Sequence, residues 1–515
     1  MALPLIPFVE LAPPRVGGVG RVHRVYRDRD RVAVCSAFGL LYWPGRAIYD
    51  GHHPRHRVAL YVDSRVVAYF DDVRFPIKDV AFHPTQPVMA IAAGAYDGGY
   101  FFNGELWWWN WVTNERRSLL GESRDVVRCR FDGDQIAILV MPPNDDEYDH
   151  DMRFGAVIDP MAVRATDRDD REIDPRLTDL EAIDPASLGF PPIDREREAR
   201  ESAAELAQLG IAPRSPVWDL AVLADGRIVA AFDDGAVEIF RATGERLVRR
   251  ELAGKAVQLL PQPDQLLVHA TRYVREQSRD DSTLYALRGD ELVEWRRFAT
   301  ARACSVDARG RVLARNVERQ QAPDQILTAD GQVLLETRLG HYDAFNHYLR
   351  IDHAPELYFL RGRPKSQHEH KQLCRIDDRQ QIHDVCAWDT EDSHLMVGCL
   401  ALVGGDLVRG YRIYNPHPGE GAKRIERVSP TGEVAWRIEV GAVASALVEW
   451  PAAGAVVFAL VDTTLGIVDA ATGAIHRLEP FVLDGLPTIV TALAVHDETL
   501  LVGTIDGRIV MFAVR

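Results

Sequence analysis

The sequence predicts an all-β protein that is built from repeated four-stranded antiparallel sheets. Runs of alternating polar and apolar residues recur along the 515-residue chain at intervals of about forty residues. Turn dipeptides such as DG, GD, TG and PD separate these runs, which is typical of many short antiparallel strands. Three segments also share one strand template, and this indicates internal repetition.

The shared template is clearest in 77–115, 217–247 and 490–515. Each segment has an alternating strand, a polar turn, a second strand of small residues, a Gly turn and a third strand that ends in an aromatic residue. The Gly stands five positions before the aromatic residue in all three segments. These pairs are Gly104 with Trp109, Gly235 with Phe240, and Gly507 with Phe512.

Weaker copies of the template fill most of the remaining chain. They occur at 126–143, 255–274, 301–317, 383–415 and 446–475. Together with strands in 22–43, these segments give between seven and ten repeated units, with eight as the central estimate.

The template resembles a blade of the WD-repeat β-propeller family, whose blades read roughly DGxVxLWDxxTG. Trp109 and Asn110 stand where the family has its Trp-Asp pair. Phe240 and Phe512 take the place of the Trp in the other two segments, and the name-giving Asp is absent from all three. The resemblance implies structural roles for these four residues. It also implies one ring of about eight four-stranded antiparallel blades, with a range of seven to ten.

The predicted organisation is a Pro-rich leader over 1–20 and a single β-propeller over 21–515. A strand from 22–43 is expected to complete the blade that ends at Arg515. This pairing would close the ring and would remove an open sheet edge.

Residues 144–214 interrupt the pattern and are predicted to form an insertion with an acidic loop and one short helix. The helix is expected over 195–211, with Asp194 as its cap and Gly210 at its end. An insertion on a rigid scaffold is a common place for partner contacts, and a solvated decoration is the equal alternative. Calcium binding by the loop is not favoured, because it lacks the ligand spacing and the Gly of calcium loops. The candidate partner-binding residues of the loop are Asp145, Asp146, Glu147, Tyr148 and Asp149.

Four tryptophans fall within five consecutive positions of the first repeat. A strand in a blade is covered on both faces by the neighbouring blades. Because side chains alternate along a strand, Trp107, Trp109 and Trp111 are expected to face one neighbour. Leu106 and Trp108 are expected to face the other. The alternative is that one or two of the tryptophans reach a rim and form part of a binding surface.

Metal and catalytic motifs receive little support from the sequence. His368 and His370 could share a metal ion, but no third ligand follows at a suitable spacing, so we favour an exposed loop that is a candidate partner contact. The chain has no GxSxG elbow, no GxxxxGK[ST] motif and no GxGxxG motif after a strand. We therefore predict no catalytic residue, no cofactor and no metal.

Three aspartates stand at a strand start in three repeats, Asp79, Asp219 and Asp384. In WD-repeat proteins this place is often structural, and the resemblance implies that role for Asp79 and Asp219. The alternative is a propeller enzyme, or a ligand-binding propeller, whose central channel these carboxylates would line.

The segment SPTGEVAWRIEVG resembles the tryptophan-docking repeat of pyrroloquinoline-quinone propellers. The residues that carry the resemblance are Thr431, Gly432, Trp436 and Gly441. Those propellers carry the motif in most blades, whereas here it is clear once. We interpret it as an outer-strand turn and not as a cofactor site.

Composition disfavours several classes of partner. The formal net charge of −16 argues against direct binding to nucleic acid or to an anionic membrane. No segment approaches 18 uninterrupted apolar residues, and the N-terminus lacks the pattern of a signal peptide. The six cysteines are scattered among apolar residues without CxxC spacing, which favours a reducing cytoplasm.

From these observations we predict a cytoplasmic, WD-repeat-like scaffold for protein–protein interactions that has no catalysis of its own. Its partners are expected to be other proteins of a multi-component bacterial assembly, regulatory or defence-related, with an ATPase or a protease among them. A propeller enzyme or ligand-binding protein with a site in the central channel is the alternative. A structural subunit of a larger particle is the third interpretation.

Overall fold

The computed structural model describes the chain in eighteen segments. The described residues are 5–11, 19–37, 56–96, 102–120, 124–144, 149, 151–162, 175–177, 180–192, 194–212, 214–274, 279–316, 323–340, 351, 354–362, 371–387, 394–414 and 423–514. The chain divides into two compact units. We call residues 1–18, 40–50 and 214–515 the ring unit, and residues 19–39 and 51–213 the three-sheet unit.

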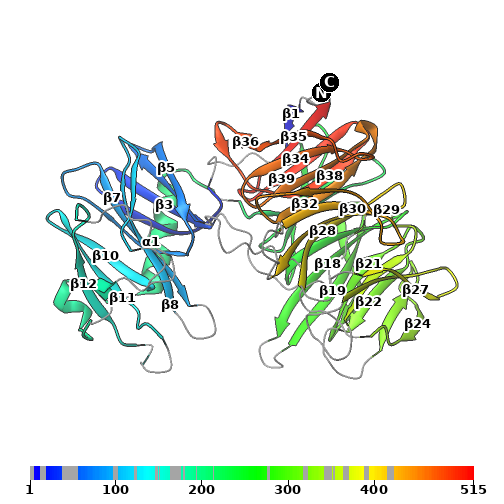
Figure 1. Ribbon diagram of the computed structural model, residues 1–515, viewed down its shortest axis with the longest axis horizontal. Coiled ribbons are helices and arrows are strands. Elements are labelled where there is room, and N and C mark those ends of the chain that lie inside the picture. The colour runs from blue at the N-terminus through cyan, green and yellow to red at the C-terminus, as the bar shows by residue number, and fades with distance from the viewer. Residues whose placement is uncertain are drawn as a thin grey trace. The chain divides into compact units, whose positions relative to one another are not determined.

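Antiparallel sheets make up the ring unit (Figure 1). The first sheet contains β13 (Val217–Val222), β14 (Ile228–Phe232), β15 (Ala236–Phe240) and β16 (Arg246–Glu251). The second contains β17 (Lys255–Pro261), β18 (Leu266–Val274), β19 (Arg279–Arg288) and β20 (Glu291–Phe298). The third contains β21 (Ala301–Val306), β22 (Val312–Asn316), β23 (Asp324–Leu327) and β24 (Val333–Thr337).

The next three sheets continue in chain order. The fourth sheet has three described strands, β25 (Leu357–Gly362), β26 (Lys371–Ile376) and β27 (Ile382–Ala387). The fifth contains β28 (His394–Val403), β29 (Asp406–Tyr414), β30 (Lys423–Val428) and β31 (Val434–Glu439). The sixth contains β32 (Ala444–Trp450), β33 (Ala455–Leu460), β34 (Thr464–Asp469) and β35 (Ile475–Pro480).

The seventh sheet joins the two ends of the chain. It contains β38 (Val490–His496), β39 (Thr499–Thr504), β40 (Ile509–Val514) and β1 (Leu5–Glu10). A short hairpin precedes it, made of β36 (Val482–Leu483) and β37 (Leu486–Pro487). A single 3-10 turn, η4 (Pro451–Ala453), links β32 to β33.

Hydrophobic clusters close these seven sheets into a ring. Each sheet shares one cluster of buried side chains with the sheet before it and another with the sheet after it. One such cluster joins the seventh sheet to the first, where Leu501 and Ile509 pack with Val217 and Phe232. Because both faces of each sheet are covered, inner strands such as β14, β15 and β33 are buried along their whole length and are mostly apolar. The predicted β-propeller fold with four-stranded antiparallel blades is confirmed.

The prediction that an N-terminal strand completes the C-terminal blade is also confirmed, but the strand is a different one. Strand β1 pairs with β40 from Leu5↔Val514 to Glu10↔Val510. It therefore lies in the segment that was predicted to be a leader, and not in 22–43. Proline lacks a backbone donor, and Pro7 is tolerated because β1 is the edge strand of its sheet and its register shifts between Pro7 and Val9.

The three-sheet unit contains the sheets of 21–158. The first sheet is β2 (Arg21–Asp28), β3 (Arg31–Ala37), β4 (His56–Val62) and β5 (Arg65–Val73). The second is β6 (Ile77–Phe82), β7 (Val88–Tyr96), β8 (Phe102–Asn110) and β9 (Glu115–Ser118). The third has three described strands, β10 (Val126–Asp132), β11 (Gln135–Val140) and β12 (Phe154–Ile158).

These three sheets pack with one another in a compact unit of their own. The sequence had suggested that they belong to one ring with all the other sheets. One cluster joins the first sheet to the second, and another joins the second to the third. On the other face of the third sheet, Phe190, Ile183 and Leu188 cover Ala137 and Leu139 of β11. The covering residues come from the insertion, so side chains from outside the strands occupy a face that a further sheet would cover in a ring.

The insertion is shorter than 144–214, because β12 (Phe154–Ile158) belongs to the third sheet. Beyond it lie two 3-10 turns, η1 (Pro175–Leu177) and η2 (Pro185–Leu188), and the helix α1 (Arg195–Gln208). The Asp194 side chain caps α1 by accepting a hydrogen bond from the backbone N of Arg197 at 2.9 Å. Gly210, with φ +66°, follows the helix as expected.

The tryptophan run lies in β8, between two sheets. Trp109 is fully buried and packs with Phe70 against the first sheet, together with Trp107 and Trp111. Trp108 faces the third sheet and is 8% exposed. The alternation along the strand therefore distributes the aromatic surface over two sheet interfaces.

The glycines of the shared template stand where the backbone needs them. Gly235 has φ +93°, and a Cβ atom there would lie 2.1 Å from the Gly254 carbonyl oxygen. A Cβ atom on Gly104 would lie 2.3 Å from the Arg124 carbonyl oxygen. Any larger residue at either position would force neighbouring backbone to move.

Candidate functional site

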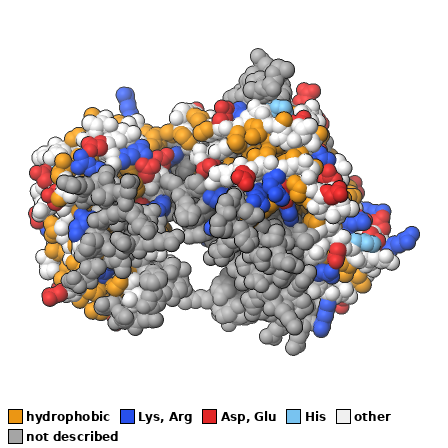
Figure 2. Space-filling model, viewed as in Figure 1, with side chains coloured by type: hydrophobic (Ala, Val, Ile, Leu, Met, Phe, Trp, Pro, Cys, Tyr) orange, Lys and Arg blue, Asp and Glu red, His pale blue; other side chains and the backbone are white. Residues whose placement is uncertain are grey.

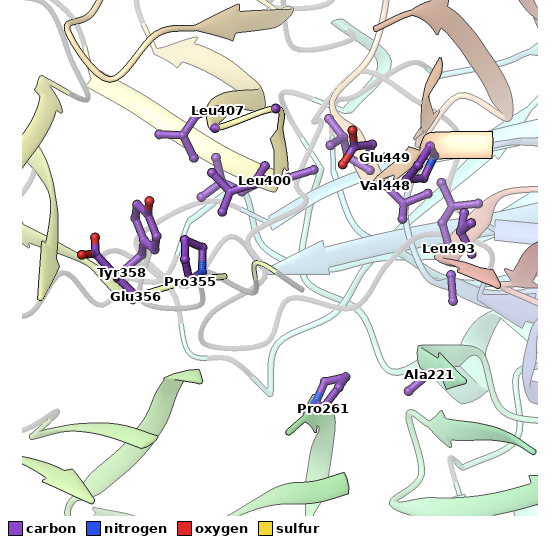
Figure 3. Close-up of a pocket in the computed structure, with 18 of the residues that line it drawn as sticks. Ala221, Pro261, Pro355, Glu356, Tyr358, Leu400, Leu407, Val448, Glu449 and Leu493 are labelled. Atoms are coloured by element: carbon purple, nitrogen blue, oxygen red, sulfur yellow. The ribbon is translucent and has the colours of Figure 1, made fainter. Parts of the chain in front are cut away.

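The ring unit contains a large cavity of about 1290 Å³ (Figure 3). Its wall comes from the first strands of several sheets, which meet around the inside of the ring. The apolar lining includes Leu220 of β13, Leu400 of β28, Val448 of β32 and Leu493 of β38. Such a cavity is large enough for a small molecule or for side chains of another protein.

Arginines pair with three of the carboxylates that line the cavity. Arg375 Nη1 pairs with Glu356, and Arg309 Nη2 pairs with Asp378. Asp384 accepts a hydrogen bond from Arg361 Nη2 at 2.7 Å. These pairs leave little uncompensated charge at that part of the wall.

Glu449 differs from these carboxylates. It lies in β32 at the cavity wall and is half-buried (Figure 3). Burial raises the pKa of Glu449, and Arg427 only partly opposes this effect. A carboxylate in this setting favours a positively charged group in the cavity.

Asp79 and Asp219 join neighbouring sheets, one in each unit. Asp79 Oδ2 in β6 accepts a hydrogen bond from the backbone N of Cys129 in β10 at 3.0 Å. Asp219 Oδ2 in β13 accepts one from the backbone N of Leu259 in β17 at 2.9 Å. Ser305 in β21 does the same for Tyr358 in β25 at 3.1 Å. In all three cases a side chain of one sheet holds the backbone of the next.

Asp384 does not share this position. It lies in β27, the third and last described strand of its sheet, and pairs with Arg361 of β25. The interpretation of Asp384 as a strand-start residue comparable to Asp79 and Asp219 is therefore wrong. The segment HDVCAW has the alternation of a strand, but the sequence does not tell a first strand from a last one.

Buried carboxylates in interior strands are the functional-looking residues that the sequence analysis missed. Glu105, Glu238 and Glu426 are all fully buried. Glu426 accepts hydrogen bonds from Arg409 Nε at 2.7 Å and Arg437 Nε at 2.8 Å. Burial raises the pKa of Glu426, but these two arginines outweigh it and hold the pKa below its ordinary value. For Glu105 and Glu238 the signal was present as an acidic residue among apolar residues of a strand, whereas the strand of Glu426 carries several charged residues.

The other two buried glutamates are also held by several donors. Glu238 pairs with three arginines, among them Arg249 Nη1 at 3.0 Å. Glu105 accepts hydrogen bonds from the backbone N of Phe75 at 3.1 Å and from Trp107 Nε1 at 2.8 Å. Burial raises the pKa of Glu105. Both carboxylates are therefore engaged with donors inside the fold.

The described cysteine side chains are poor nucleophiles. Cys35, Cys129, Cys304, Cys374 and Cys386 are buried free thiols. Burial raises the pKa of Cys304 to about 12 and that of Cys374 to about 12. A thiol with such a pKa carries almost no thiolate at neutral pH.

Most of the candidate partner-binding residues lie outside the described residues. These are Asp145, Asp146, Glu147, Tyr148, His368 and His370. Asp149 is described and exposed, and its Oδ1 accepts a hydrogen bond from the backbone N of Asp151 at 3.0 Å. Its role in partner binding stays a prediction.

The aromatic template residues and Asn110 occupy matching places in their sheets. Trp109, Phe240 and Phe512 are all at most 4% exposed. Asn110 Oδ1 accepts hydrogen bonds from the backbone N of Val112 at 3.0 Å and of Thr113 at 3.1 Å. This side chain therefore stabilises the turn that follows β8.

The tryptophan-docking resemblance corresponds to a contact between two sheets. Trp436 of β31 is 7% exposed, and its Nε1 donates to the Ala470 carbonyl oxygen at 3.1 Å. A Cβ atom on Gly473 would lie 2.7 Å from the Trp436 ring. The motif therefore attaches one outer strand to the turn of the next sheet.

Three further observations bear on metals, membranes and the surface. Within the described segments, no three His, Cys, Asp or Glu side chains converge as a metal site would require. None of the helices in those segments has the length and apolarity needed to cross a bilayer. Figure 2 shows basic and acidic side chains interspersed over the described surface of each unit on the face in view.

Comparisons with known proteins relate this chain to others only through solved structures. No protein family and no curated protein matches the sequence. BamB from Moraxella catarrhalis is 16% identical over 58% of this chain and 84% of its own, with a TM-score of 0.37. A catalytically inactive virginiamycin B lyase from Staphylococcus aureus with quinupristin is 12% identical over 59% and 96%, with a TM-score of 0.42. A selenomethionine form of that lyase is 12% identical over 59% and 98%, with a TM-score of 0.40.

Proposed function

We propose that this protein is a non-catalytic scaffold for protein–protein interactions. The use of its carboxylates is the observation that carries the proposal. Asp79 and Asp219, the best candidates for channel chemistry, hold the backbone of the adjacent sheet. Glu356, Asp378 and Asp384 at the cavity are paired with arginines. A general acid or base needs a side chain that is free to exchange a proton with a substrate. Asp79 and Asp219 are instead engaged between sheets, and arginines compensate the charge of the other three carboxylates.

The proposed assembly is a cytoplasmic bacterial one, regulatory or defence-related, in which a WD-repeat-like ring presents its rims to other proteins. An ATPase or a protease is the partner class that we propose. This step rests on the general use of rigid β-propellers as interaction platforms, and a fold alone does not determine function. The fully packed blades support it, because loops on a rigid scaffold can present a constant surface.

The test is isolation of the tagged full-length protein from its native cell, followed by gel filtration and mass spectrometry of each fraction. We expect a protein partner that co-elutes in a fixed molar ratio and survives a second column. A matched preparation of an unrelated tagged protein from the same cell identifies background proteins. If the chain elutes alone as a monomer at every salt concentration used, the scaffold proposal fails.

Glu449 favours a second candidate function, a ligand-binding site in the ring cavity. Its half-buried carboxylate and raised pKa fit a ligand with a cationic group and an apolar body. Thermal-shift screening with small organic amines and guanidines would detect such a ligand. Glu449→Gln should abolish the shift, whereas a shift that is unchanged in this variant would place the ligand elsewhere.

A further inference from the structure

Helix α1 docks on the three-sheet unit through a narrow polar face. Ten of its fourteen residues are exposed, and Ser202 is the only buried one. Glu198, Ser202 and Glu205 recur at intervals of three and four positions, so they lie on one face of the helix. Leu206 is half-buried next to them. Apolar packing therefore contributes little to the attachment of this helix.

Arginines of two different sheets hold that face. Glu198 pairs with Arg24 Nη2 of β2 at 2.6 Å and with Arg128 Nη2 of β10 at 2.5 Å. Glu205 pairs with Arg27 Nε of β2 at 2.5 Å. We call Arg24, Arg27 and Arg128 the arginine surface. In the three-sheet unit, β2 begins the first sheet and β10 begins the third. Helix α1 therefore connects two sheets that share no hydrophobic cluster among the described residues.

The electrostatics of the contact favour the charged form of Glu198. Burial raises the pKa of Glu198, but Arg128 and Arg24 outweigh this and hold the pKa below its ordinary value. Arg128 Nη1 also lies 3.5 Å from Asp79 Oδ1, which partly offsets the charge of Arg128. Arg128 is thus paired within the sheets as well, with Glu198 as its second carboxylate partner.

The edge strand β2 also contacts α1 through its backbone. The backbone N of Val25 in β2 donates to Ser202 Oγ at 3.1 Å, so a helix side chain satisfies a donor on an edge strand. A space of about 300 Å³ remains between α1 and strands β2 and β6, and Tyr26, Phe82 and Glu201 are among its lining residues. The fit of α1 on this surface is therefore incomplete, in contrast to the close packing between sheets.

We propose that the arginine surface is the docking site for a carboxylate-bearing helical segment of a partner protein, and that α1 occupies it as a built-in competitor. The partner helix would place two carboxylates seven positions apart, as Glu198 and Glu205 are in α1. The inference rests on the proposed scaffold function and adds the chemistry of one partner and its regulation. Because α1 is tethered, a free segment must compete with it, and the apparent affinity of that segment is its intrinsic affinity multiplied by the fraction of protein in which α1 has left the surface.

The experiment uses the full-length protein and a labelled peptide that corresponds to residues 194–210. In the wild-type protein α1 blocks the surface, so peptide binding should be weak and hydrogen exchange at the Val25 amide slow. The double substitution Glu198→Ala and Glu205→Ala removes the charged contacts of α1 with all three arginines. We expect faster exchange at Val25 and peptide binding at least about tenfold tighter than in the wild-type protein. Added salt should weaken the peptide binding.

Two controls are matched to this design. Glu196→Ala removes one carboxylate from the exposed side of α1, where Glu196 is 90% exposed, and should leave peptide binding and exchange unchanged. A peptide that carries alanine at both contact positions should not bind. If the double variant does not fold, Arg27→Ala offers a milder change, because this side chain is 34% exposed and contacts Glu205 alone among the helix carboxylates. It should raise exchange at Val25 by a smaller factor.

Two outcomes would overturn the inference. In the first, exchange at Val25 shows that α1 has opened in the variant, yet the peptide does not bind. In the second, Val25 stays as protected in the variant as in the wild-type protein, which would mean that the carboxylates do not hold the helix. Either result leaves the scaffold proposal intact if the full-length protein still co-purifies with a stoichiometric partner. Peptide binding without any partner in native cells would contradict the scaffold proposal instead.

Discussion

The ring unit and the three-sheet unit use the same kind of sheet but cover their exposed faces differently. In the ring unit every sheet is covered by two other sheets, and β1 beside β40 completes the last one. In the three-sheet unit Phe190 and its neighbours cover β11, and α1 lies on β2 and β10. The repeated sheets of the ring unit therefore cover one another, whereas the three-sheet unit depends on the insertion, which does not follow the repeat. A segment of that kind can be displaced or exchanged at less cost than a sheet.

The largest expected effect is the loss of a template aromatic in one unit only. Trp109→Ala and Phe240→Ala each remove a side chain that is at most 1% exposed and should lower the free energy of unfolding of their own unit by about 3–5 kcal/mol. Calorimetry should resolve two transitions, each shifted by one variant alone. Val112→Ala and Val293→Ala are the controls, because these side chains are 72% and 42% exposed. If both transitions move together in either variant, the two units do not unfold independently.

The next effect concerns the aspartates that join neighbouring sheets. Asp79→Ala and Asp219→Ala each leave a buried backbone N–H, that of Cys129 or Leu259, without its acceptor. We expect a loss of about 1–3 kcal/mol in each unit, measured by urea unfolding. Asparagine at either position keeps an acceptor oxygen and should recover part of the loss. An Asn variant as unstable as the Ala variant would show that the charge, and not the hydrogen bond, is what matters.

The same comparison shows what the sequence could predict. The template glycines and aromatics correctly predicted four-stranded antiparallel sheets that are covered on both faces. A covered blade leaves no room for a Cβ atom at Gly235 and buries the Phe240 ring. Alternation also predicted the two faces of the tryptophan run correctly. Both results depend on local geometry, which a single repeat carries in full.

Features that depend on partners distant in the sequence could not be predicted. Strand β1 was not predicted, because Pro7 disfavours a strand locally and the pairing partner, β40, lies at the other end of the chain. Asp384 looked like a strand-start residue because a last strand has the same alternation as a first one. Glu238 and Glu426 are charged and would be expected at the surface, but arginines from other strands make their burial favourable. The division into two units likewise depends on which sheets share a cluster.

The two units should also respond to pH with opposite signs at one buried group each. Burial raises the pKa of Asp79 to about 6, so the folded three-sheet unit binds a proton more tightly than the unfolded chain does. The contribution of Asp79 to stability is largest at pH values below the pKa of Asp79 in the unfolded chain, and it is lost as the pH rises through about 6. Burial lowers the pKa of His269 in the ring unit to about 3, so its contribution is present above the unfolded pKa and is lost as the pH falls.

Differences between the wild-type protein and single variants isolate these groups. Between pH 7 and pH 5, the stability difference between the wild-type protein and Asp79→Asn should change by about 1 kcal/mol in favour of the wild type. For His269→Gln it should change by about 2 kcal/mol against the wild type. Urea unfolding at several pH values measures both. Changes of the same sign in the two units would contradict the assigned causes.

The smallest expected effect lies in two turns that match across the units. Asn110 Oδ1 accepts from the backbone N of Val112 and Thr113, and Asp469 Oδ1 accepts from that of Ala471 and Thr472. Asn110→Ala should cost at most about 1 kcal/mol, because water can replace an exposed turn contact. Hydrogen bonds from Thr472 hold the pKa of Asp469 below its ordinary value, so the effect of Asp469→Ala should persist at mildly acidic pH. Asn110 does not titrate and should show no such pH dependence. A pH-dependent Asn110 variant would mean that this turn is coupled to a titrating neighbour, and the two turns would then differ in more than the identity of one side chain.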